Sequence, residues 1–185
     1  MINGLFLSDF YTIFHAPNSD ELIEFCNEKS ELDVRNDLFS WGKNCVVDKI
    51  LLKWEDLIDL YQPSLEIFSQ QLDKKFNYTM FNPWLNLYDR GYYQELHCHK
   101  GFDLSSIFFV NDGINFSELF FYDRNVVNFS DNFEELISYK STINIPYKKG
   151  DIIFFPSHTL HGVTSHQNDD IRKTLSVNFK IDKVK

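Results

Sequence analysis

From Met80 onward the chain consists of short runs rich in Phe, Tyr, Ile and Val, separated by turn residues. Such runs are typical of β-strands, and Asp112-Gly113 and Lys149-Gly150 offer glycines for left-handed turn positions. A chain with this pattern folds mainly as antiparallel sheet. At least five strands are predicted, over Trp84–Tyr88, Leu104–Val110, Glu118–Tyr122, Ile152–Phe155 and Ile171–Ile181.

The part of the chain before Met80 has a mostly helical pattern. One helix is expected from Ser19 to about Cys26, with an acidic first turn followed by apolar residues at helical spacing. Two more are predicted over Trp54–Tyr61 and Ser64–Phe76, with apolar residues at helical spacing. Pro63 is expected to separate them, because proline removes a helical hydrogen bond.

Helices followed by short strands predict a mainly β fold with N-terminal helices, of the α+β class. The most specific prediction is a double-stranded β-helix, or jelly roll, with the helices packed on one sheet. We expect residues 1–185 to form a single domain. Residues 1–79 would be its mostly helical N-terminal part, and residues 80–181 the jelly-roll core.

Charge and composition argue against several classes of protein. There are 27 Asp and Glu against 18 Lys and Arg, a net charge of −9, so no basic face is expected that could bind a nucleic-acid backbone. The longest apolar runs, such as Ile107–Val110 and Ile152–Pro156, are far shorter than the roughly 20 residues of a membrane-spanning helix. Neither nucleic acid nor a membrane is therefore an expected partner.

The expected compartment is the cytoplasm, because no secretory signal is visible at the start of the chain. The three cysteines, Cys26, Cys45 and Cys98, have unrelated spacings. This pattern suits reduced thiols rather than a disulfide framework or a cysteine-based zinc site. The oligomeric state is left open.

His97-Cys98-His99 is the first group of residues that suggests chemistry. Residues i and i+2 of a strand point to the same face, so His97 and His99 can bind one metal ion, whereas Cys98 would point away. Two ordinary surface histidines would give the same pattern. His161 lies much further along the chain, after the apolar run that ends at Pro156. A histidine pair followed by a distant third histidine is how a jelly roll can bind Fe(II) and leave open positions for substrate and O₂.

The last predicted strand has one polar face, formed by Arg172, Thr174, Ser176 and Asn178. A polar face must meet either water or a polar pocket. Arg172 follows His161 at about the length of a hairpin, so the returning strand could bring its guanidinium to the same cavity. There it could bind a carboxylate through two hydrogen bonds. A solvated arginine on an outer face is the alternative.

These segments, taken in order, resemble the small 2-oxoglutarate- and Fe(II)-dependent oxygenases of bacteria and phages that are related to the prolyl hydroxylases. The resemblance covers about residues 80–180, with Ser117 where glycine is usual. It rests on Trp84-Leu85-Asn86-Leu87-Tyr88, Gly91, His97-Cys98-His99, Ser105–Val110, Glu118–Asp123, Gly150–Ser157, His161, Val163 and Arg172–Asn178.

The resemblance implies that His97 and His161 bind iron and that Arg172 binds the C5 carboxylate of the co-substrate 2-oxoglutarate. It also implies that Tyr88, Asn86, Ser176 and Asn178 line the co-substrate pocket. Most related proteins have Asp or Glu at the third ligand position, where this chain has His99.

A site of three neutral histidines is chemically reasonable, because the 2-oxoglutarate dianion can balance the charge of the iron. Asp103, at an even spacing from His97, is the nearest carboxylate if His99 points away. His158 is expected at the surface or behind the ligands.

The main hypothesis is an oxygenase that decarboxylates 2-oxoglutarate to succinate and hydroxylates an unidentified substrate, either a small molecule or a protein side chain. One alternative is a non-catalytic, cupin-like metal-binding module. Another is a three-histidine dioxygenase that uses no keto acid. Only the first of these requires Arg172 to bind a keto acid.

Overall fold

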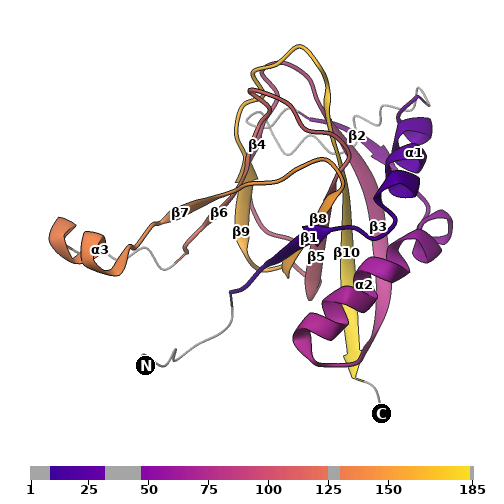
Figure 1. The fold of residues 1–185 in the computed structure, drawn as a ribbon, viewed down its shortest axis with the longest axis horizontal. Coiled ribbons are helices and arrows are strands. Elements are labelled where there is room, and N and C mark those ends of the chain that lie inside the picture. The colour runs from indigo at the N-terminus through magenta and orange to yellow at the C-terminus, as the bar shows by residue number, and fades with distance from the viewer. Residues whose placement is uncertain (1–8, 32–46, 125–129, 184–185) are drawn as a thin grey trace.

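The computed structural model describes residues 9–31, 47–124 and 130–183 and shows two facing antiparallel sheets, with the helices over Ser19–Ser30 and Ile58–Leu72 on one side (Figure 1). The helices are α1 (Ser19–Ser30), the short 3₁₀ helix η3 (Trp54–Asp56), α2 (Ile58–Leu72) and α3 (Asp131–Ile137). The strands are β1 (Thr12–His15), β2 (Asp48–Leu51), β3 (Phe76–Tyr88), β4 (Gln94–His97), β5 (Leu104–Phe109), β6 (Leu119–Tyr122), β7 (Thr142–Ile145), β8 (Asp151–Pro156), β9 (Leu160–Val163) and β10 (Arg172–Lys183).

The larger sheet has six strands in the order β1-β8-β5-β10-β3-β2, and the smaller has four in the order β4-β9-β6-β7. This is the predicted double-stranded β-helix. Strands distant in sequence are neighbours in it, since β10 pairs with both β3 and β5, and β4 pairs with β9. The topology therefore joins the segment around His97 to segments that lie much later in the chain.

The helices α1 and α2 cover the outer face of the six-stranded sheet, as expected (Figure 1). Their buried side chains include Leu22 on α1 and Leu65 on α2, which join the same core as Leu175 and Phe179 of β10. A second apolar cluster lies between the two sheets. It comprises Ile107, Phe109, Leu119, Phe121, Ile145, Ile153 and Phe155.

The predicted break at Pro63 is wrong, because α2 runs through this residue. The proline removes one backbone hydrogen bond near the start of the helix. The buried face formed by Tyr61, Leu65 and Phe68 continues on both sides of it, so tertiary packing outweighs the missing bond. The other predicted helix, Trp54–Tyr61, is not one helix. Its first part forms η3 (Trp54–Asp56), and its last part, from Ile58, is the start of α2.

The helix predicted to reach Phe76 ends earlier, at Leu72, and Phe76 begins β3. Asp73 adopts a left-handed conformation with φ 51°, which ends the helix. The N-terminal part also supplies β1 and β2 to the large sheet, so it is not purely helical. Both are four-residue strands, which are too short to show a reliable alternation.

Of the two predicted turn glycines, only Gly150 is left-handed, with φ 85°. In the other turn the left-handed residue is Asn115, with φ 62°. Gly113 is required for a different reason: a Cβ atom there would lie 2.6 Å from the Phe116 ring.

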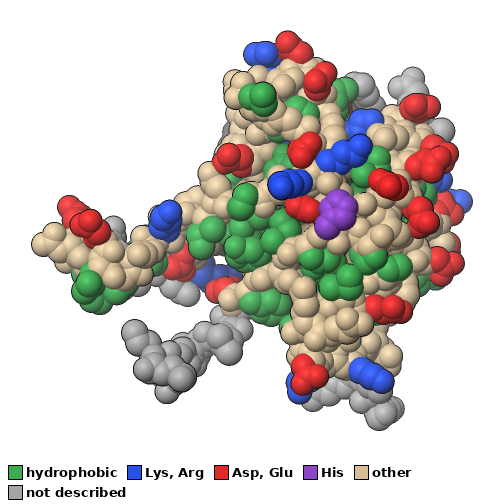
Figure 2. All heavy atoms as spheres, in the orientation of Figure 1, with side chains coloured by type: hydrophobic (Ala, Val, Ile, Leu, Met, Phe, Trp, Pro, Cys, Tyr) green, Lys and Arg blue, Asp and Glu red, His purple; other side chains and the backbone are tan. Residues whose placement is uncertain are grey.

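Cys26 and Cys98 are free thiols, as expected, and Cys45 lies outside the described residues. Burial raises the pKa of the Cys26 thiol to about 12, so it stays protonated. Acidic side chains are scattered over the face shown in Figure 2, interspersed with Lys and Arg. None of the described helices is long and apolar enough to cross a bilayer.

Candidate functional site

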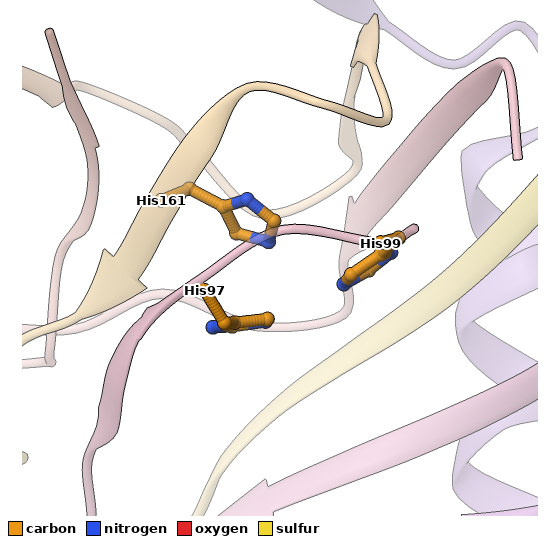
Figure 3. Close-up of side chains that lie close together, drawn as sticks. All are labelled: His97, His99 and His161. Atoms are coloured by element: carbon orange, nitrogen blue, oxygen red, sulfur yellow. The ribbon is translucent and has the colours of Figure 1, made fainter. Parts of the chain in front are cut away.

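Three histidines converge between the two sheets (Figure 3). His97 ends β4 and lies directly opposite His161 of β9 in the antiparallel register. Residues opposite each other in such a pair have neighbouring side chains. His99 lies just beyond β4, where its backbone amide donates to the Ser157 carbonyl at 2.8 Å. Its ring lies beside the other two.

The distances between the rings suit one shared metal ion. One ring nitrogen from each of the three histidines lies within 4.8 Å of the others. The ring centroids are 4.3 Å apart for His97 and His161, 5.0 Å for His99 and His161, and 5.3 Å for His97 and His99. The structure thus brings together the histidines that the sequence analysis singled out.

Each histidine has a hydrogen-bond acceptor for its Nδ1 atom. His97 can donate to the Glu95 carbonyl at 2.8 Å, and His161 to the Thr159 carbonyl at 2.9 Å. His99 can donate to Oδ1 of Asn178 at 2.6 Å. A proton on Nδ1 leaves the lone pair on Nε2, so the three acceptors select the tautomer in which Nε2 can bind a metal.

The three imidazoles lie in an environment that favours their neutral form. Burial lowers the pKa of His97, and it lowers the pKa of His99 to about 4. Burial, followed by the repulsion of the other two histidines, lowers the pKa of His161 well below its ordinary value. Neutral imidazole is the form that binds metal ions.

Asp103, the alternative third ligand, and His158 both lie away from the three histidines. The Asp103 carboxylate accepts a hydrogen bond from the Ile181 amide at 3.0 Å and lies 3.7 Å from Nζ of Lys180. It is not part of the histidine cluster. His158 is half exposed at the surface, where its Nε2 lies 3.0 Å from a carboxylate oxygen of Asp9.

Arg172 begins β10 and is buried, with only 1% of its surface exposed. Its Nε donates to the Tyr147 hydroxyl at 2.8 Å. Its Cζ atom lies 4.8 Å from the ring centroid of Tyr88 and 5.8 Å from that of Phe109. These aromatic rings hold the guanidinium in place and keep it out of water.

The Nη1 atom of Arg172 is buried without any hydrogen-bond partner among the described residues. Burying a charged donor unpaired is unfavourable, so such an atom marks a place where an acceptor is expected to bind. Arg172 and all three histidines line the same small cavity between the sheets. A ligand that reaches from the guanidinium to the imidazoles would fill it.

The other predicted pocket residues divide into two groups. Asn86 and Ser176 line the cavity and are joined by a 2.9 Å hydrogen bond from Nδ2 to Oγ. Tyr88 also lines it, with its hydroxyl donating to Gln94 at 2.6 Å. Asn178 instead lies against His99 and receives a hydrogen bond from Ser105 at 2.8 Å.

The sequence analysis gave no role at the site to Tyr147, Gln94 or Trp84. Tyr147 lies in the loop after β7, and Gln94 begins β4. No spacing rule links either residue to Arg172 or Tyr88, so only the tertiary contacts show their place. Trp84 lines the cavity, and its indole N–H donates to Asn86 at 2.9 Å. The Trp84-x-Asn86 spacing on one strand was the available signal.

Comparison with known proteins decides the family. Residues 82–178 match the family model described as "Putative 2OG-Fe(II) oxygenase". The chain belongs to this family. Its members use Fe(II) and 2-oxoglutarate, as the sequence resemblance predicted. No curated protein matches the chain in sequence.

Three solved structures share the fold. A 2OG-Fe(II) oxygenase family oxidoreductase from Burkholderia pseudomallei has a TM-score of 0.67 and 9% identity, covering 92% of this chain and 84% of that one. A Pseudomonas putida prolyl-4-hydroxylase has a TM-score of 0.64 and 14% identity, covering 95% and 93%. HygX from Streptomyces hygroscopicus, with nickel and 2-oxoglutarate bound, has a TM-score of 0.66 and 10% identity, covering 94% and 83%.

The residues of this chain fit both groups that the family uses. Three neutral imidazoles with Nε2 lone pairs suit a divalent transition metal ion. The unpartnered Nη1 of Arg172 suits one end of a dicarboxylate, and the cavity connects it to the histidines.

Proposed function

We propose that this protein is a hydroxylating oxygenase in which His97, His99 and His161 bind Fe(II) and Arg172 binds the C5 carboxylate of 2-oxoglutarate. The unpartnered Nη1 of Arg172, buried in the cavity that the three histidines line, is the observation that carries the proposal. A metal-binding module has no need for a desolvated guanidinium at this position.

When bound, Fe(II) would supply the chemistry by which O₂ oxidises both partners, with one oxygen atom going to the succinate formed with CO₂ from 2-oxoglutarate and the other to the hydroxyl group on a substrate C–H bond. The protein holds the imidazoles in one tautomer through the acceptors on their Nδ1 atoms. It also excludes water from the end of the cavity that His161 and Arg172 line, since these residues are only 2% and 1% exposed. A dry and preorganised site strengthens each polar contact with the co-substrate.

The polar face of β10 would orient the co-substrate. Asn86 donates from Nδ2 to the hydroxyls of both Thr174 and Ser176, at 3.2 and 2.9 Å. Each hydroxyl keeps its own proton, which it can donate to a carboxylate in the cavity. Tyr147 fixes Nε of Arg172, and the unpartnered Nη1 would donate to the C5 carboxylate.

Anaerobic titration with 2-oxoglutarate tests the proposal. Protein loaded with Fe(II) should develop the weak visible charge-transfer band of a chelated keto acid. Arg172→Met should keep iron but need at least about tenfold more 2-oxoglutarate for half saturation, because a charge-assisted pair is lost. Arg172→Lys should be intermediate, since a point charge cannot make two parallel hydrogen bonds.

Arg90→Met is the matched control, because Arg90 is an exposed arginine paired with Asp169. It should bind iron and 2-oxoglutarate like the parent. If the parent binds Fe(II) but no 2-oxoglutarate, the metal-binding module or a dioxygenase without a keto acid becomes the better account. If the parent does bind 2-oxoglutarate, succinate formed in air separates a catalyst from a binding protein.

A further inference from the structure

A second, open pocket of about 710 Å³ lies beside the histidine cluster. His97 and His99 line it together with Trp84 and Asn178, so it adjoins the metal site on the side away from Arg172. Arg172 is not among its lining residues. This volume is typical of pockets for small organic ligands.

The wall of this pocket is apolar but has two positive charges. Leu51, Leu52, Trp84, Phe102 and Leu160 supply the apolar surface. The charged lining residues are Lys49 and Lys100, and none of the described residues that line the pocket is acidic. In a chain of net charge −9, the charged groups among the described residues that line this pocket are all basic, and their charge favours an anion over a cation.

Lys49 is the inner of the two lysines. It pairs with Asn86 in the register of β2 with β3, and only 5% of its surface is exposed. Its Nζ lies 5.4 Å from the Trp84 ring centroid. Its charge also reaches the histidines, because it contributes to the lowered pKa of His97 and of His99. Lys100 is exposed, at the rim.

A β-bulge lies next to Trp84 in the wall of the open pocket. The register between β10 and β3 shifts between Ser176 and Asn178, and Asn82 has a left-handed backbone with φ 42°. Asn82 itself lines the pocket. Bulges of this kind redirect the side chains that follow them, often next to active sites.

We propose that the primary substrate is a small apolar molecule carrying one carboxylate or phosphate group, an inference that rests on the proposed function. Its anion would pair with Lys49, and its apolar body would lie on Trp84 and Phe102, with a C–H bond facing His97 and His99. The iron does not supply this anion preference. Three neutral histidines leave it dicationic, and the 2-oxoglutarate dianion would cancel that charge.

Three probes that differ chiefly in charge test the proposal: 2-naphthylacetate, 2-naphthylacetamide and 2-naphthylethylamine. Binding is measured by calorimetry on protein loaded with Zn(II), which does not turn over, and saturated with 2-oxoglutarate. We expect the anion to bind about tenfold more tightly than the amide, and the cation to bind most weakly.

Lys49→Met should remove the preference for the anion and leave the amide affinity unchanged, which also shows that the pocket is intact. Lys49→Arg should retain the preference. Lys53→Met is the matched control, because Lys53 is exposed and is not a lining residue. It should behave like the parent.

Equal affinity for all three probes in the parent would overturn the proposal, as would an anion preference that survives Lys49→Met. An anion preference of the parent lost only in Lys100→Met would overturn the assignment to Lys49. The titration of the same samples with 2-oxoglutarate reports on the proposed function separately. If that titration fails, the three probes are measured on metal-free protein, where the Lys49 dependence is judged by the same criteria.

Discussion

The two faces of β10 are both buried, yet they are chemically opposite. Leu175, Val177 and Phe179 face the helices and are 0% exposed. On the other face, Arg172, Thr174, Ser176 and Asn178 are between 1% and 5% exposed. A strand buried on both sides is ordinarily apolar on both. The polar face therefore has little value for folding and is explained by what it binds.

This contrast separates stability from function along one strand. Burial of Leu175, Val177 and Phe179 stabilises the fold through the hydrophobic effect. The polar face requires a hydrogen-bond partner for every buried group, and Nη1 of Arg172 lacks one among the described residues. Substitutions on the two faces should therefore fail in different assays.

The largest effect is expected from Phe179→Ala. Its ring centroid lies 6.0 Å from that of Tyr61 and 6.4 Å from that of Phe154, so truncation leaves a cavity under α2. The free energy of unfolding should fall by about 3–5 kcal/mol, measured by urea denaturation. Ser176→Ala, on the opposite face, should change it by about 1 kcal/mol or less. A similar fall in the free energy of unfolding for both variants would contradict the assignment of stability to one face of β10 and of binding to the other.

Next is the comparison of His99→Ala with Asp103→Ala. Removing His99 should lower Fe(II) affinity by more than about 100-fold, because losing a ligand exceeds the effect of losing a group that orients one. Asp103→Ala should retain iron, since its carboxylate contacts the Ile181 amide and Lys180. Metal content after gel filtration is the measurement. Loss of iron in the Asp103 variant alone would make that carboxylate the third ligand.

A smaller effect is expected from Asn178→Ala, which removes the acceptor from Nδ1 of His99. Fe(II) affinity should fall by about tenfold, with the 2-oxoglutarate affinity of the iron-loaded protein unchanged. Ser105 Oγ lies 3.2 Å from the same nitrogen and can replace the lost acceptor. The double variant with Ser105→Ala should therefore bind iron more weakly still. If the variant instead binds iron normally but 2-oxoglutarate more weakly, Asn178 contacts the co-substrate rather than supporting His99.

The smallest effect is expected from Thr174→Val. It removes one of the two hydroxyls that accept from Asn86, and Ser176 retains the other. Stability should change by about 1 kcal/mol, and iron affinity should not change. The 2-oxoglutarate titration should shift by less than about tenfold, less than for Arg172→Met. A shift as large as that of Arg172→Met would show that Thr174 itself binds the co-substrate.

The sequence alone predicted the jelly roll, because long strands such as β5, β8 and β10 combine β-forming residues with clear turn residues between them. It also singled out His97, His99 and His161, as a close pair followed by a distant third histidine, and Arg172, from the polar face of the last predicted strand. The sequence placed both histidines of the pair on one strand, whereas β4 ends at His97 and His99 lies just beyond it. Of the four-residue strands only β6 was among the five predicted, and β1, β2, β4, β7 and β9 were not, because four residues carry little pattern.

Only the tertiary structure decided how these faces meet. The register of β4 with β9 brings His97 opposite His161, and the pairing of β10 with β5 brings Asn178 to Ser105. Tyr147 meets Arg172 from a distant loop, and Lys49 enters the open pocket from a strand that the sequence did not reveal. Contacts of this kind depend on strand order and register, which are set by the packing of the whole chain rather than by any local pattern of residues.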